Sequence, residues 1–172
     1  INSRISVVMS DVKRFATPHK SISKYDEIAA FKDDANNGNV GFNGHAFVEA
    51  LTSDKDGRIQ EAGSSNFIAV DKDGNIITPS TRNQDFLDGV TRRSAIALAG
   101  KGKVIERDIY ESEIPELRAA CLTGSAARVL VLSSIGYNET LYELDGDNPD
   151  ILRLQEMVVD VRSGNVSKAH KN

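Results

Sequence analysis

The stretch 86–100, FLDGVTRRSAIALAG, combines residues that could hold an anion with the apolar spacing of a helix. Gly89, Val90 and Thr91 come where that helix would begin, and we call these three residues the phosphate seat. The N–H groups at the start of a helix carry partial positive charge and suit a phosphate. Gly89 allows close approach of the backbone, and Thr91 adds a hydroxyl donor. The spacing therefore indicates an anion-binding site.

A plain capped helix explains the same stretch, with Asp88 or Thr91 as the cap, and it is the simpler interpretation of these residues alone. The segment 122–129, LTGSAARV, offers a second candidate. Its Gly-Ser-Ala step lies between apolar runs and presents N–H groups and the hydroxyl of Ser125, which suit an anion. A tight turn with no ligand is the alternative there.

Two further stretches carry ionisable side chains. In 61–67, EAGSSNF, the carboxylate of Glu61 stands beside small residues and could pair with a cationic ring nitrogen; an exposed carboxylate at a strand end is the alternative. In 17–27, TPHKSISKYDE, Lys20 lies at a junction into a helix and Tyr25 follows five residues later. A lysine held in a pocket can lose its proton and form a Schiff base, whereas most lysines are simply solvated.

The elements that must position these residues are mixed in type. Apolar patterns and turn residues predict a strand at 5–9, a helix at 23–37, a Gly/Asn-rich loop at 36–44, two Asp-Gly hairpins over 46–79, a helix at 90–99 ended by Gly100, a strand at 103–109, a helical turn at 111–117, two strands over 118–136 and a helix at 148–164 with Asn148 as cap and Gly164 as end. This order predicts an α+β domain and argues against a doubly wound sheet.

Composition narrows the class of protein. The 172 residues suffice for one domain, and the net charge of −4 gives no reason to expect nucleic acid or a membrane as partner. The single cysteine, Cys121, lies in an apolar run, where a core thiol is expected, and fits a reducing, cytoplasmic compartment. The aspartates of the two Asp-Gly segments lack EF-hand spacing and predict turns. The three histidines lack the spacing of a metal site, so no metal is expected.

Taken together and in this order, the motifs resemble the class IV (fold type IV) pyridoxal-phosphate enzymes. That family includes branched-chain aminotransferases, D-amino-acid aminotransferases and aminodeoxychorismate lyases. DKDGRIQEAGSSNFIAV is similar to the family's Glu-bearing strand with its Asn continuation, FLDGVTRRSAIALA to its LPGITR helix start, and LTGSAARV to its Ser/Thr-Gly-Thr-Ala turn. The resemblance runs from about residue 15 to residue 136.

The resemblance implies a role for each candidate. Lys20 would bind pyridoxal 5′-phosphate covalently and then act as the base, Tyr25 would lie near the cofactor's ring oxygen, and Glu61 would bond the pyridine nitrogen. Further contacts to the cofactor, chiefly to its phosphate, would come from Leu87, Gly89, Val90, Thr91, Ser125 and Ala126, the last two also serving the substrate carboxylate. After the lysine, SISKY departs from the Gly-Gly-Asn-Tyr run of branched-chain enzymes.

The resemblance also implies a fold and an activity. The fold would be the hairpin-rich pseudo-barrel with flanking helices that forms the large, C-terminal domain of the family. Residues 1–172 hold no counterpart of the family's small N-terminal domain, which is expected elsewhere in the same gene product. The expected activity is amino transfer between a branched-chain L-amino acid and 2-oxoglutarate, in a homodimer. A lyase or D-amino-acid aminotransferase on the same fold, and a non-catalytic domain, are the alternatives.

Overall fold

The computed structural model of the chain describes residues 4–10, 33, 42, 46–82, 86–126 and 128–164. The strands in these ranges are β1 (Ile5–Met9), β2 (Glu49–Ser53), β3 (Ile59–Ala62), β4 (Asn66–Val70), β5 (Ile76–Pro79), β6 (Val104–Arg107), β7 (Ala119–Gly124), β8 (Arg128–Tyr137) and β9 (Thr140–Glu143). The helices there are α2 (Val90–Ala99), the 3₁₀-helix η1 (Glu111–Glu116) and α3 (Pro149–Arg162). Within the described ranges, no helix is long and apolar enough to span a bilayer.

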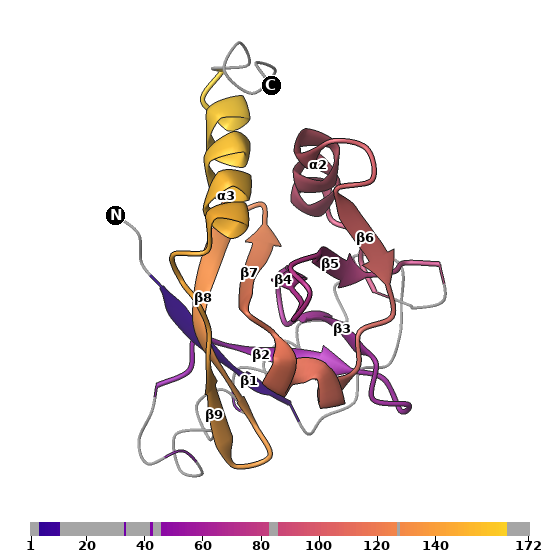
Figure 1. Cartoon of the computed structure of the whole chain (residues 1–172), viewed down its shortest axis with the longest axis vertical. Helices are drawn as coiled ribbons and strands as arrows, with labels where there is room; N and C mark the ends of the chain where they lie inside the picture. The colour runs from indigo at the N-terminus through magenta and orange to yellow at the C-terminus, as the bar shows by residue number, and fades with distance from the viewer. Residues whose placement is uncertain are drawn as a thin grey trace.

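Six of the strands form a closed ring. They follow one another in the order β3-β2-β1-β8-β7-β4, and β4 pairs with β3 again through Glu61 and Asn66 (Figure 1). Strands β5 and β6 extend the sheet beyond β4, and β9 pairs with β8. Strand β1 is parallel to both β2 and β8, whereas the hairpins are antiparallel. This mixed, barrel-like sheet with helices beside it confirms the predicted α+β fold.

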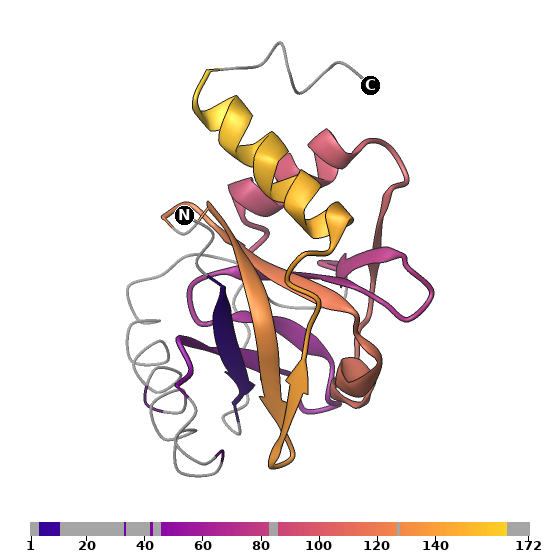
Figure 2. The ribbon, with the colours of Figure 1, turned by 60° about the vertical axis from the view of Figure 1, so that its left-hand side comes forward.

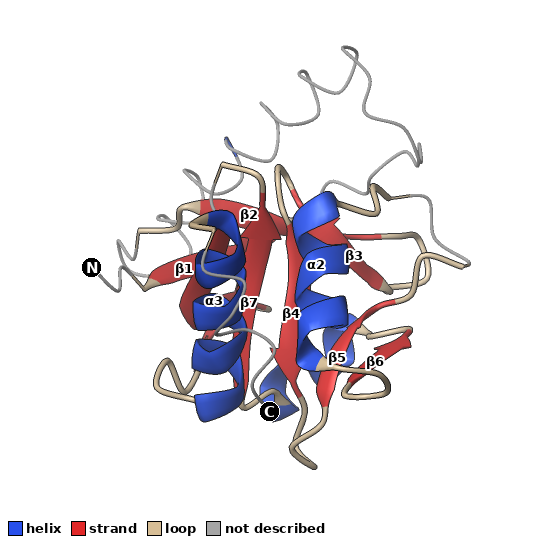
Figure 3. Cartoon of the chain, turned by 90° about the horizontal axis from the view of Figure 1, so that it is seen from above, coloured by secondary structure: helices blue, strands red, loops and turns tan. Residues whose placement is uncertain are grey.

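Strands β4 and β7 are buried on both faces. Successive side chains point to opposite sides of a strand, so alternate residues of each strand enter different hydrophobic clusters. On β4, Phe67 contributes to the cluster that fills the ring, and Ile68 to the cluster beneath the helices. On β7, Leu122 and Cys121 divide between the two clusters in the same way. Helices α2 and α3 lie side by side over this outer cluster (Figure 3) and on the same side of the molecule in the turned view (Figure 2). Alternate residues of β4 and β7 therefore lie beneath the helices, and the residues between them point into the ring.

Both predicted helices in the described ranges are confirmed, with small differences at their ends. Helix α2 begins at Val90, and its C-cap is Gly100 with φ of 99°. The Oδ1 atom of Asn148 caps α3 by accepting from the N–H groups of Asp150 (3.1 Å) and Ile151 (3.4 Å). The helical part of α3 ends at Arg162, two residues before the predicted Gly164, which adopts φ of 78°.

The Asp-Gly segments form the predicted turns. In the first, Asp54 Oδ1 accepts from the N–H groups of Asp56 (2.9 Å) and Arg58 (3.0 Å), and Gly57 adopts φ of 77°. The second repeats this pattern around the carboxylate of Asp71. A side-chain oxygen that binds the backbone two and four residues onward replaces part of the hairpin ladder, so these aspartates have a structural role.

Three expectations differ from the structure or fall outside it. Strand β9 was not predicted, because its two-residue turn uses Asn138 (φ 47°) and Glu139 (φ 58°) where a glycine would have signalled a hairpin. Strand β6 is shorter than the predicted 103–109. The helix expected at 23–37 and the loop at 36–44 lie outside the described residues apart from residues 33 and 42.

Candidate active site

The N-terminus of α2 carries no side-chain cap. Gly89 is the N-cap residue and has no side chain to cap with, and among the described residues neither Asp88 nor Thr91 caps the helix; the first turn holds no acidic residue. The interpretation of 86–100 as a plain helix capped by Asp88 or Thr91 is therefore wrong. The first N–H groups of a helix have no partner within it. The N–H of Gly89 donates to Asn66, whereas those of Val90 and Thr91 have no acceptor among the described residues and are open to a ligand.

Part of the phosphate seat and the Ser125 turn line one pocket. The pocket has a volume of about 240 Å³, and its wall includes Val90, Thr91 and Ser125. Its far side is formed by the last turns of α3, where Arg162 Nη1 donates to the carbonyl oxygen of Ser125 (2.7 Å). The structure thus brings together two candidate stretches that lie more than thirty residues apart in sequence. Leu87, Gly89 and Ala126 do not line this pocket.

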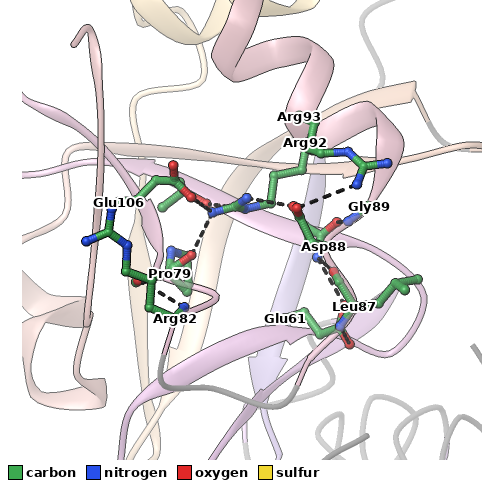
Figure 4. A network of polar contacts seen from close by, with 12 residues as sticks. Glu61, Pro79, Arg82, Leu87, Asp88, Gly89, Arg92, Arg93 and Glu106 are labelled. Carbon is green, nitrogen blue, oxygen red and sulfur yellow. Dashed lines mark hydrogen bonds and ion pairs between the residues drawn. The ribbon is translucent and has the colours of Figure 1, made fainter. Parts of the chain in front are cut away.

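Glu61 is a buried carboxylate held by N–H donors. It lies on β3 and is 4% exposed, which excludes the exposed strand-end carboxylate considered from the sequence. Its Oε2 accepts from Asn66 Nδ2 (3.1 Å), and its Oε1 accepts from the backbone N–H of Leu87 (3.3 Å). Both oxygens therefore act as acceptors, as an ionised carboxylate does. Figure 4 shows Glu61 beside Leu87. Leu87 belongs to the segment that leads into the phosphate seat.

Asn66 joins Glu61 to the phosphate seat, a role that sequence reasoning missed. Besides its bond to Glu61, its Nδ2 donates to the carbonyl oxygen of Leu87 (2.6 Å), and its Oδ1 accepts from the N–H of Gly89 (3.2 Å). A Cβ at position 89 would lie 2.3 Å from that Oδ1, so this contact requires glycine. The available signal was an asparagine opening an otherwise apolar strand, since a buried amide needs partners.

Arg92, on the first turn of α2, was also missed, although it is almost completely buried. Its side chain is 2% exposed. Its Nη1 donates to Asp88 Oδ1 (2.8 Å), and its Nη2 donates to Glu106 Oε2 (2.6 Å) and to the carbonyl oxygen of Pro79 (2.9 Å), while Nε donates to Thr78 Oγ1 (3.3 Å) (Figure 4). The guanidinium thus joins Asp88, in the segment before α2, to strands β5 and β6. Helical spacing alone would have placed an arginine here at the surface.

Three candidates remain. Cys121 is a buried thiol, and Lys20 and Tyr25 lie outside the described residues. Cys121 is completely buried, and burial raises the pKa of its thiol to about 12, as expected for a core residue. Lys20 and Tyr25 lie outside the described residues, so their predicted roles stay predictions. The described part of the candidate site is therefore the carboxylate, the phosphate seat and the pocket beside it.

Similarity to known proteins shows the family and the fold of this chain. The family pattern described as "Amino-transferase class IV" matches residues 2–135. The branched-chain-amino-acid aminotransferase 1, mitochondrial, of Arabidopsis thaliana is 32% identical over 126 residues, which cover 72% of this chain and 32% of that protein. A probable branched-chain-amino-acid aminotransferase of Aquifex aeolicus is 39% identical over 86 residues, covering 48% of this chain and 27% of that protein.

Solved structures share the fold. The branched-chain amino acid aminotransferase from Escherichia coli has a TM-score of 0.78 at 22% identity, covering 92% of this chain and 52% of that one. The enzyme of Thermobaculum terrenum in its PLP form has a TM-score of 0.82 at 22% identity, covering 98% and 54%. This chain thus spans 32% and 27% of those two curated relatives and about half of those structures. By the match over residues 2–135, the chain belongs to the class IV aminotransferase family.

Proposed function

We propose that this chain is the cofactor-binding domain of a pyridoxal-phosphate-dependent aminotransferase acting on branched-chain L-amino acids, with 2-oxoglutarate as amino acceptor. The observation that carries the proposal is the connection of a buried carboxylate, through Asn66, to an uncapped helix N-terminus. A pyridine nitrogen and a phosphate, at opposite ends of one cofactor, need such a pair of partners. The relatives named as branched-chain aminotransferases support the substrate class.

The described residues fit that cofactor. The open N–H groups of Val90 and Thr91 and the hydroxyl of Thr91 match a phosphate, and Ser125 lines the same pocket. The ionised Glu61 would accept a hydrogen bond from a protonated ring nitrogen, and its two N–H donors keep it aimed. When bound, the cofactor supplies an electron sink for the substrate's α-carbon. The backbone groups of Leu87 and Gly89 bind Glu61 and Asn66, so these two residues would shape the cofactor site, and Ala126 would contribute through its backbone.

The protein's own residues then have the tasks of binding, orienting and moving a proton. Lys20 would anchor the cofactor and, once displaced by the substrate amine, move the proton at the substrate's Cα. Tyr25 would donate to the cofactor's ring oxygen. A small domain of the same gene product and a second copy of the chain, as the family resemblance implies, would complete the walls of the substrate site.

A covalent-labelling experiment tests the proposal. We expect added pyridoxal phosphate to give a visible absorbance band, and borohydride reduction followed by mass spectrometry to find the label on Lys20. Lys20→Ala should abolish the label, while Lys24→Ala should retain it. The proposal would be contradicted if this chain and the full gene product, both folded, gave no absorbance band with the cofactor.

Assays of substrate class separate the related activities. We expect L-leucine, L-isoleucine or L-valine to yield glutamate from 2-oxoglutarate. Turnover of D-alanine in their place would assign the chain to the D-amino-acid enzymes. Release of pyruvate from aminodeoxychorismate without a keto acid would indicate a lyase.

A further inference from the structure

Asp88 lies immediately before the phosphate seat, where a carboxylate is unfavourable for phosphate binding. Acidic side chains near the start of a helix are stabilised by its free N–H groups and dipole, so a carboxylate and a phosphate compete for the same groups. In this chain the carboxylate does not cap α2. Its Oδ1 instead accepts from Arg92 Nη1 (2.8 Å), and its Oδ2 lies 3.8 Å from Arg93 Nη1.

Arg92 is the fixed member of this ion pair. Its side chain is 2% exposed, whereas that of Asp88 is 35% exposed. The other N–H groups of the guanidinium bind β5 and β6, through Thr78, the carbonyl of Pro79 and Glu106. Thr78 is itself tied to the sheet, because its hydroxyl donates to the carbonyl oxygen of Phe67 (2.7 Å). The arginine therefore determines where the carboxylate of Asp88 lies.

We infer that Arg92 is a positioning residue for the phosphate seat: it holds the Asp88 carboxylate off the N-terminus of α2 and neutralises its charge, so that the seat accepts a phosphate. The inference rests on the proposed function for the identity of that anion. Without Arg92, the carboxylate either binds the open N–H groups or leaves a negative charge beside them that the exposed Arg93, 3.8 Å away, offsets only weakly. Both outcomes weaken phosphate binding, and both are reduced when Asp88 is replaced by Asn, because a neutral amide binds backbone N–H groups less strongly than a carboxylate does and does not repel the phosphate.

The test is a double-mutant cycle with ligands that differ only in phosphate. Arg92→Met should weaken binding of pyridoxal phosphate and of inorganic phosphate by about tenfold or more, as an interaction of about 1.4 kcal/mol or more with the helix N-terminus would. Binding of pyridoxal, which lacks the phosphate, should change little. Adding Asp88→Asn to Arg92→Met should recover most of the lost phosphate affinity, because the competing charge is gone. Absorbance titration and calorimetry measure these affinities.

Two further variants control for charge and for folding. Arg93→Met removes the same charge from the same turn, but its side chain is 59% exposed and more distant from Asp88, so the affinity for phosphate should change by less than about threefold. Arg92→Lys keeps the charge and loses the forked geometry, so its loss should be intermediate and should again be recovered by Asp88→Asn. If Arg92→Met does not fold, the same comparison is made with Arg92→Lys alone and together with Asp88→Asn.

The outcomes separate the inference from the proposed function. Equal losses for pyridoxal and pyridoxal phosphate, or no recovery by Asp88→Asn in folded variants, would overturn the inference while the cofactor site stands. Phosphate binding that follows the cycle, in a protein that forms no adduct at Lys20, would leave the inference standing and refute the proposed activity. A wild-type protein that binds neither phosphate nor the cofactor refutes both.

Discussion

At the scale of single residues, a buried carboxylate needs a reason to stay buried, because removing a charge from water is costly. Among the described residues, Glu61 meets this requirement with two N–H donors, one from Asn66 and one from the backbone of Leu87. Its side chain was expected from the sequence to be one end of a cofactor site, but the donors that orient it were not. In this site, orientation comes from the same segment that leads into the phosphate seat.

Replacing Glu61 by Gln should separate cofactor binding from catalysis. The amide cannot stabilise a protonated ring nitrogen, so the rate of amino transfer should fall by about 10- to 100-fold, the range expected for losing one charged hydrogen bond. Cofactor affinity should fall less, because the phosphate contacts remain. Steady-state kinetics and an absorbance titration measure the two effects.

Glu49→Gln is the matched control for that substitution. Glu49 lies on the neighbouring strand, and its carboxylate binds the backbone and hydroxyl of Ser64 outside the candidate site. An unchanged rate in a folded Glu61→Gln protein, or an equal loss in Glu49→Gln, would argue against the role given to Glu61.

Asp54 makes stability depend on pH through its turn. Burial acts to raise the pKa of Asp54, but hydrogen bonds from Arg58 and Asp56 outweigh it and hold the pKa below its ordinary value of 3.8. A lowered pKa stabilises the fold above the unfolded-state value, and this contribution is lost as pH falls through the folded-state value. Urea unfolding below about pH 4 should therefore show a shallower loss of stability in Asp54→Asn than in the wild type. Asp56→Asn should keep most of the wild-type slope, because within the described ranges the carboxylate of Asp56 accepts from the side chains of Lys55 and Arg58 and from no backbone N–H.

At the scale of elements, the relation between β4 and α2 depends on one close contact. The N–H of Gly89 reaches Asn66 Oδ1, and a methyl group at position 89 would overlap that oxygen at 2.3 Å. Strand β4 and helix α2 can therefore lie this close because Asn66 offers an amide oxygen and Gly89 has no side chain. Glycine serves here for space, since its φ of −66° is open to any residue.

Gly89→Ala should lower the free energy of unfolding by about 1–3 kcal/mol, the usual cost of overpacking, and should weaken phosphate binding as well. In an Asn66→Ala background the same substitution should cost much less, because the overlapping oxygen is gone. Chemical denaturation of the four proteins gives the coupling energy. Additive effects would show that the overlap does not govern this approach.

At the scale of the whole molecule, the cluster beneath α2 and α3 packs helices and sheet together, so we expect them to unfold as one cooperative unit. Leu154, 1% exposed, and Ile68, completely buried, belong to this cluster from opposite sides of the contact. Leu154→Ala should lower the free energy of unfolding by about 2–5 kcal/mol in a single transition seen by both far- and near-UV circular dichroism. Leu152→Ala, at a partly buried position of the same helix, should cost less. A separate early transition of α3 would show that the helix is not part of the unit.

The sequence predicted what depends on neighbours along the chain and missed what depends on neighbours across the fold. Caps and Asp-Gly turns are local, so the turn at Asp54 and the cap at Asn148 could be predicted from a few residues. The contacts of Asn66 and Arg92 depend on where β4, β5 and β6 lie, and no local pattern gives that. Strand β9 escaped because two non-glycine residues adopt positive φ in its turn.

The closed ring of strands has a consequence for how the molecule folds. Its hairpins join neighbours in sequence, but β1 completes the ring by pairing with β8, where Ile5 meets Leu132. Bringing such distant segments together costs chain entropy before any contact rewards it, and folding rates fall as such pairings come to dominate. The hairpins can therefore form early, while closure must wait for β8. Pulsed hydrogen exchange during refolding should find the amides of β1 among the last to be protected.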